Sequence, residues 1–193
     1  MTSASVFPRA RVLAVALAAA LLALVAVQLM TARPAGNAGA AAGGVHITMT
    51  VTGAKTGNFK GDDGGRANVI TVLAYQYELQ APTDISSGGA TGKVVHKPVT
   101  ITHLLGGSSP EFLFAAATGE DLTKVQIDFY RVNRNGTETN YYRVILTNAV
   151  VTDVKQYSAG DNVREDIEFL YRKIEQKSLT ANTDFIANVV TAT

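Results

Sequence analysis

The chain has 193 residues, of which 47% are hydrophobic and 17% are charged, with 17 Lys and Arg against 16 Asp and Glu. Arg9, Arg11 and Arg33 precede the first acidic residue, Asp62, so the rest of the chain carries a net charge of −2. This composition excludes a disordered acidic tail and a basic nucleic-acid-binding surface. Because the sequence has no cysteine, it also excludes disulfides, thiolate metal sites, cysteine nucleophiles and lipid attachment through cysteine.

Residues 1–40 are predicted to be a targeting segment with a small-residue linker. Two arginines precede an apolar run from Val12 to Met30, and this layout is typical of a secretory signal peptide. Ala40 and Ala42 end candidate cleavage sites. As a helix the run would be about 28 Å long, close to the roughly 30 Å of a bilayer core, so a retained N-terminal membrane anchor is the alternative. Either interpretation predicts export.

From residue 45 the pattern of hydrophobicity changes to a period of two. Val45 to Thr52 alternates apolar and polar residues and predicts a half-buried strand. Gly53 to Asn68 is rich in glycine and predicts a loop. Val69 to Leu79 predicts a second strand. Its odd-numbered apolar and aromatic residues are expected on one face: Val69, Leu73, Tyr75, Tyr77 and Leu79.

The middle of the chain predicts a loop, a strand and one helix. Ser86 to Gly92 is expected to be a flexible loop, and Lys93 to His103 has strand character with an irregular point at Pro98. A short helix then follows. It is predicted from Ser109 as N-cap, Pro110 at the first position, Glu111 at the positive end of the dipole and Gly119 as the stop.

Three more strands are predicted in the last third. Lys124 to Val132 is joined by an Asn135-Gly136 turn to Tyr141–Val154, which we expect to be bent or broken near Asn148. Asp166 to Ile174 alternates, with Ile167, Phe169 and Tyr171 on one face. The tail from Leu179 to Thr193 is either a last strand or an unanchored end.

About six strands and one short helix predict an all-β, mainly antiparallel fold. We expect a small β-barrel over residues 45–193, preceded by the N-terminal apolar helix. A β-sandwich is the alternative.

The polar residues do not assemble a reaction centre. His46, His96 and His103 lack the spacing of metal ligands and are expected to be solvated on the surface. Gly92-Lys93 is no phosphate loop, because Val94 stands where the motif needs Ser or Thr. Asp62-Asp63 lacks the pattern of a calcium loop and predicts a solvated loop.

A carboxylate cluster near the C-terminus is the remaining candidate for chemistry. Asp166 and Glu168, next to Glu165, share a predicted strand face and are expected to form an exposed face or a charged edge, not an acid/base pair. We therefore predict no enzyme, no cofactor and no metal site.

Several blocks in fixed order resemble the haemolysin-coregulated protein (Hcp) family. They are His96 to Thr102, Ser108-Ser109-Pro110 with the helix, Val125 to Arg131, Tyr141 to Ala149 and Glu165 to Glu175. The similarity covers roughly Val45 to Glu175. The sequence departs from the family at the N-terminal leader, at Gln176 where Trp is common, and from Lys177 onward.

This resemblance implies a structural subunit and not an enzyme. It implies hexameric rings that stack into the inner tube of the type VI secretion apparatus, with the spike protein and secreted effectors as partners and without nucleic acid. It also implies that one loop reaches a neighbouring ring: Ser86, Ser87, Gly88, Gly89, Ala90, Thr91 and Gly92. Because of the leader, an exported binding or effector module, or an extracellular filament outside any contractile apparatus, is the alternative.

Overall fold

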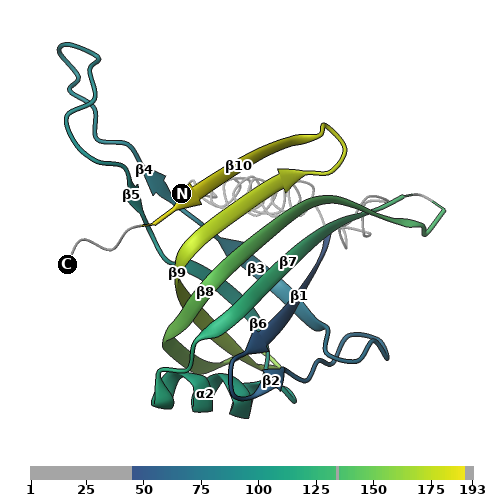
Figure 1. The fold of residues 1–193 in the computed structure, drawn as a ribbon. Coiled ribbons are helices and arrows are strands. Elements are labelled where there is room, and N and C mark those ends of the chain that lie inside the picture. Colours follow the sequence, from purple (N-terminus) through teal and green to yellow (C-terminus); the bar gives the residue numbers. More distant parts are fainter. Residues whose placement is uncertain (1–44, 134, 190–193) are drawn as a thin grey trace, which may run out of the picture. The chain divides into compact units, whose positions relative to one another are not determined.

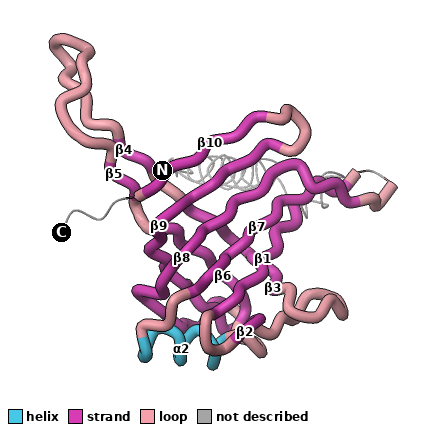
Figure 2. Tube along the Cα trace, viewed as in Figure 1, coloured by secondary structure: helices cyan, strands magenta, loops and turns pink. Residues whose placement is uncertain are grey.

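The computed structural model describes residues 45–133 and 135–189, and β-strands form most of this part of the chain (Figures 1 and 2). The predicted N-terminal signal or anchor lies outside the described residues. Within them, no helix has both the length and the apolar character needed to cross a membrane. The elements are β1 (Val45–Gly53), β2 (Gly57–Asn58), β3 (Ile70–Gln76), β4 (Leu79–Gln80), β5 (Val95–His96), β6 (Val99–Leu104), α2 (Ser109–Thr118), β7 (Leu122–Val132), β8 (Glu138–Ala159), β9 (Asn162–Ser178) and β10 (Thr183–Asn188).

Six of these strands close into a barrel. β1 pairs with β3, β3 with β6, β6 with β9, β9 with β8, β8 with β7, and β7 returns to β1, every pair being antiparallel. The predicted antiparallel barrel is therefore confirmed, and the sandwich alternative is wrong. Because the barrel is closed, each of the six strands has a paired neighbour on both sides.

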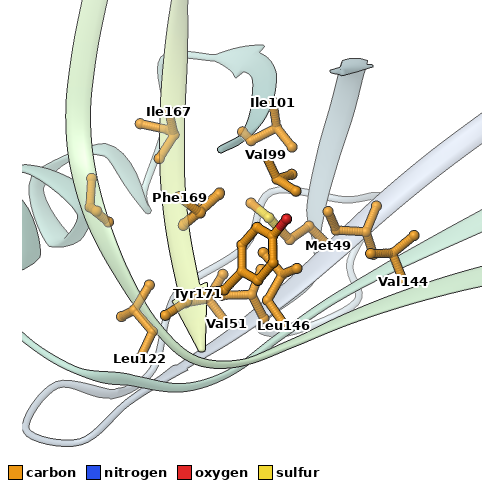
Figure 3. Packing of buried hydrophobic residues seen from close by; sticks show 14 of the residues in the cluster. Met49, Val51, Val99, Ile101, Leu122, Val144, Leu146, Ile167, Phe169 and Tyr171 are labelled. Atoms are coloured by element: carbon orange, nitrogen blue, oxygen red, sulfur yellow. The ribbon is translucent and has the colours of Figure 1, made fainter. Parts of the chain in front are cut away.

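The barrel is filled by the inward side chains of its strands (Figure 3). On β9 the predicted alternation holds, because Ile167, Phe169 and Tyr171 are buried while Leu170 and Arg172 are exposed. This is the period of two expected of a strand with one face on a core.

The prediction that the odd-numbered residues of β3 share one face is wrong in the first half of the strand. Ile70 and Val72 point into the core, and Leu73 is exposed. The pairing of β3 with β6 shifts register between Val72 and Ala74. An extra residue at such a bulge exchanges the two faces, so that Tyr75 beyond it packs against the core while Leu73 does not.

The long strands β7, β8 and β9 form two successive hairpins. The Asn135-Gly136 turn is confirmed: the Asn133 amide donates to the Thr137 carbonyl at 2.9 Å, and Gly136 has a φ of 79°. β8 is unbroken over 22 residues, although Asn148 has a left-handed φ of 50°. The irregularity predicted near Asn148 is thus limited to the backbone of this one residue, and asparagine tolerates the left-handed conformation.

Helix α2 lies across one end of the barrel (Figure 1). The N-cap is Ser108, one residue before the predicted Ser109, whose hydroxyl instead accepts a hydrogen bond from the Gly106 amide at 3.0 Å. Gly119 ends the helix with a φ of 60°, as expected of a left-handed C-cap. Phe112 is fully buried, so packing holds this short helix.

The ambiguous tail contains a strand. β10 pairs with the last part of β9, from Lys173 to Ser178. Pro98, the predicted irregular point, separates β5 from β6.

Candidate assembly surface

A long hairpin-like excursion leaves the barrel between β3 and β6 (Figures 1 and 2). β4 and β5 pair at its base, Lys97 donates to the Glu78 carbonyl at 3.0 Å, and a bridge joins Thr83 to Ala90 further out. The sequence predicts the loop but not this ladder. We call residues 79–96 the projecting loop.

The tip of the projecting loop is organised by one carboxylate. Asp84 accepts hydrogen bonds from the Ser86 amide at 3.0 Å and from the Ser87 hydroxyl at 2.8 Å. These bonds, led by the Ser86 amide, hold the pKa of the Asp84 carboxyl below its usual value. Asp-x-Ser-Ser is a turn signature, so a signal for this local structure is present in the sequence although the tip was predicted only as a flexible loop.

The predicted contact residues all lie on this tip and are all exposed: Ser86, Ser87, Gly88, Gly89, Ala90, Thr91 and Gly92. Beside them Ile85 is fully exposed, and Leu79, Val94 and Val95 are also largely exposed. The protrusion thus exposes several apolar side chains that its own fold does not bury.

Helix α2 lies at the end of the barrel opposite the projecting loop (Figure 1), and apolar side chains around it are exposed. Leu105 donates its amide to the Val163 carbonyl at 3.0 Å, which joins the end of β6 to the β8–β9 turn. We call the following residues the helix-end patch, each between 38% and 50% exposed: Leu104, Leu105, Leu113, Phe114 and Val163.

A buried polar cluster holds this end of the barrel together. His103 on β6 and Glu165 on β9 are both fully buried, and their Nε2 and Oε1 atoms are 3.0 Å apart. Gln156 on β8 donates to the other oxygen of Glu165. The His103 ring also packs 5.5 Å from that of Phe112 on α2. The expectation that His103 is solvated is therefore wrong.

Three elements thus meet at one carboxylate. Burial alone would raise the pKa of Glu165, but hydrogen bonds from His103 and Gln156, the charge of His103 and the Ser109 hydroxyl hold it below its usual value. No spacing in the sequence signals this cluster, because His103 and Glu165 meet only through the register of β6 against β9.

The other side chains that were expected to be solvated also contact neighbouring residues. His46 contacts Glu138 and Asp63, and His96 lies 3.1 Å from the Tyr77 hydroxyl. Asp63, predicted to be solvated, is only 9% exposed and accepts a hydrogen bond from the Thr71 hydroxyl at 3.0 Å. The loop bearing it is not fully solvated.

The candidates for chemistry remain dispersed. Gly92 and Lys93 precede β5, not the helix that a phosphate loop requires. Asp166 accepts a hydrogen bond from Thr102 at 2.6 Å and is a strand-face residue. Among residues 45–133 and 135–189, no group of three or more His, Asp or Glu side chains could hold a metal ion.

Comparison with known proteins matches this geometry to one family. The family model described as "Type VI secretion system effector, Hcp" matches residues 48–177. The "Major exported protein" of Pseudomonas aeruginosa is 39% identical over 118 residues, which cover 57% of this chain and 69% of that protein.

Solved structures give the same answer. Hcp1 from E. coli EAEC 042 has a TM-score of 0.68 and 26% identity, and the match covers 75% of this chain and 99% of that one. The secreted protein Hcp3 from Pseudomonas aeruginosa has a TM-score of 0.63 and 29% identity, covering 77% and 100%. A further structure titled "Crystal structure of Hcp protein" has a TM-score of 0.70 at 20% identity, covering 75% and 99%, and supports the fold alone.

The chain belongs to the Hcp family of type VI secretion tube proteins. This confirms the resemblance predicted from the sequence, and with it a structural role and not an enzymatic one.

Proposed function

We propose that this Hcp-family chain is an exported building block that assembles with copies of itself into hexameric rings, which stack into a tube. Family membership supports self-association. The stacking is supported by one observation: two exposed apolar surfaces lie at the two ends of one barrel. The projecting loop ends in exposed Ile85, and the helix-end patch exposes Leu113 and Phe114.

Two different surfaces at opposite ends make a head-to-tail contact. Such a contact can repeat without limit, because each added subunit leaves one of its two surfaces free for the next subunit. We therefore propose that Ser86 to Gly92, together with the preceding Ile85, reach the helix-end patch of a subunit in the next ring. The spike protein at the end of the tube and effectors in its lumen are the further partners we propose.

Export is supported by the name of the Pseudomonas aeruginosa relative, "Major exported protein". We propose that residues 1–40 direct it, as a signal peptide cleaved near Ala40 or Ala42, and that residues 45–193 form the mature barrel domain. Retention of residues 12–30 as an anchor would place the barrel at a membrane. N-terminal sequencing of the exported protein separates the two outcomes.

The leader favours one alternative function. An Hcp-like chain with a secretory leader fits an extracellular filament or binding module outside a contractile apparatus. The same rings would then form without a sheath, so imaging exported material from cells that lack sheath genes distinguishes the two.

The stacking is tested with single substitutions at each end. Ile85→Asp and Phe114→Asp should each shorten the stacks seen by negative-stain imaging while rings persist in light scattering. Ile85→Val is the matched control and should stack normally. A protein that stays monomeric at high concentration would refute the proposed assembly, and stacks unaffected by both Asp variants would refute the end-to-end contact.

A further inference from the structure

A second histidine cluster lies on the side of the barrel, away from the buried His103. The His46 ring on β1 lies between two carboxylates from different segments. Its Nδ1 is 2.7 Å from Glu138 Oε1 at the start of β8, and its Nε2 is 3.4 Å from Asp63 Oδ1 in the loop before β3. The side chains of these residues are 24%, 37% and 11% exposed, so water screens them only in part.

Two more side chains complete the surroundings of His46. Tyr130, its cross-strand partner on β7, has its ring centroid 5.9 Å from that of His46. Arg66 donates through Nε to Asp63 at 2.6 Å, and its guanidinium lies 6.0 Å from the centre of the Tyr130 ring. The charged groups that face the imidazole are therefore two carboxylates and one arginine already paired with Asp63.

The contacts of His46 depend on its protonation. An imidazolium donates from both nitrogens, whereas a neutral imidazole has one N–H and one lone pair. The shorter contact, at Nδ1, indicates that a neutral ring keeps its proton toward Glu138. Its Nε2 lone pair would then face the Asp63 carboxylate, and an attraction would become a repulsion.

Asp63 is the point at which this change would act on the fold. It is the one buried residue between residues 62 and 68, where its neighbours are exposed. The loop is also held by backbone bonds, including the Asp63 amide to the Val69 carbonyl at 3.0 Å, and by Thr71, whose hydroxyl donates to Asp63 at 3.0 Å and whose amide donates to Asp62 at 3.3 Å. The contact with His46 is thus one of several that fasten the loop, and it is the one that changes when the imidazole gains or loses a proton.

We propose that His46 is a pH-sensitive latch for the loop of residues 62–69. The protonated ring joins Asp63 to Glu138 and tightens the loop on the barrel, and the neutral ring leaves Asp63 bound only by Thr71, Arg66 and its own backbone. Histidine changes its charge between about pH 5 and 8, so the latch is closed at the acidic end of this range and loosened at the alkaline end. This inference does not depend on self-association.

Millisecond hydrogen–deuterium exchange of the purified full chain tests the latch. After correction for the intrinsic pH dependence, amides of residues 62–69 should exchange about fivefold faster at pH 8.5 than at pH 5.5, the size expected of one partly exposed ion pair. Peptides from the β8–β9 hairpin serve as the internal reference and should not change.

Two variants separate the latch from a general effect of pH. His46→Gln should remove the pH difference in the loop, and His96→Gln, at a histidine outside this cluster, should keep it. The wild-type profile needs no variant to fold. Loop exchange that is equal or slower at pH 8.5, or a pH difference that persists in His46→Gln, would overturn the proposal.

Discussion

Replacing Glu165 tests how the helix end of the barrel is held. Glu165→Ala removes an acceptor shared by the buried His103 and Ser109 and by Gln156, an exposed residue of β8. An unpaired buried donor costs about 1–3 kcal/mol, and breaking a buried pair costs about 3–5 kcal/mol. We therefore expect a loss of about 3–5 kcal/mol in the free energy of unfolding, or roughly 6–20 °C in Tm for a domain of this size.

The assay is urea and thermal unfolding followed by far-UV circular dichroism, because the chain has no tryptophan. Protein concentration is kept equal, since self-association shifts apparent stability. Glu168→Gln, at a partly exposed position on the same strand, is the matched control and should change stability little. A loss below about 1 kcal/mol in Glu165→Ala would refute the view that this carboxylate fastens three elements.

The lowered pKa of Glu165 adds a pH signature. A carboxyl whose pKa is lower in the folded chain stabilises the fold above its unfolded value, and this contribution is lost as pH falls through the folded value. Wild-type protein should therefore lose stability in acid, and Glu165→Gln should lack that share of the loss. Equal acid sensitivity of the two proteins would contradict the assignment.

Three further changes test the packing. Phe112→Ala should cost about 3–5 kcal/mol in urea unfolding, because the fully buried ring joins α2 to the core; a cost near zero would show that α2 is not held by it. Gly61→Ala would place its Cβ against the backbone of Val69, where there is no room for it, and should lower Tm markedly, whereas Gly92→Ala meets only ordinary contacts and should be tolerated. Burial, and then the nearby tyrosines, raise the pKa of Tyr75 well above its usual value. Its contribution to stability is complete below about pH 10 and is lost above it, so an absorbance titration should show Tyr75 ionising only as the barrel unfolds in alkali.

Local signals in the sequence predicted the elements well where one residue decides the conformation. Gly119 ends the helix, Gly136 turns the hairpin and Pro98 interrupts a strand, because each acts through its own backbone. The alternation on β9 was likewise sufficient to predict which side chains are buried.

The failures share a different cause. The bulge after Val72 and the burial of His103 and Asp63 depend on which strand lies beside which, and at what register. A single sequence contains no record of these pairings. The polar cluster around Glu165 could therefore not be predicted from motif spacing. His103 lies within a predicted strand, but Gln156 and Glu165 lie just outside the predicted strands Tyr141–Val154 and Asp166–Ile174.

The order in which the barrel closes has a consequence for the newly made chain. β8 and β9 are joined by a tight turn and can form early, whereas β6 must wait for β9 and β1 must wait for β7. The pairing of β6 with β9, in which Val99 lies opposite Phe169, thus forms only when most of the polypeptide is present. A chain that is exported through a translocon would therefore stay largely unfolded for nearly its whole passage and would fold only at the end.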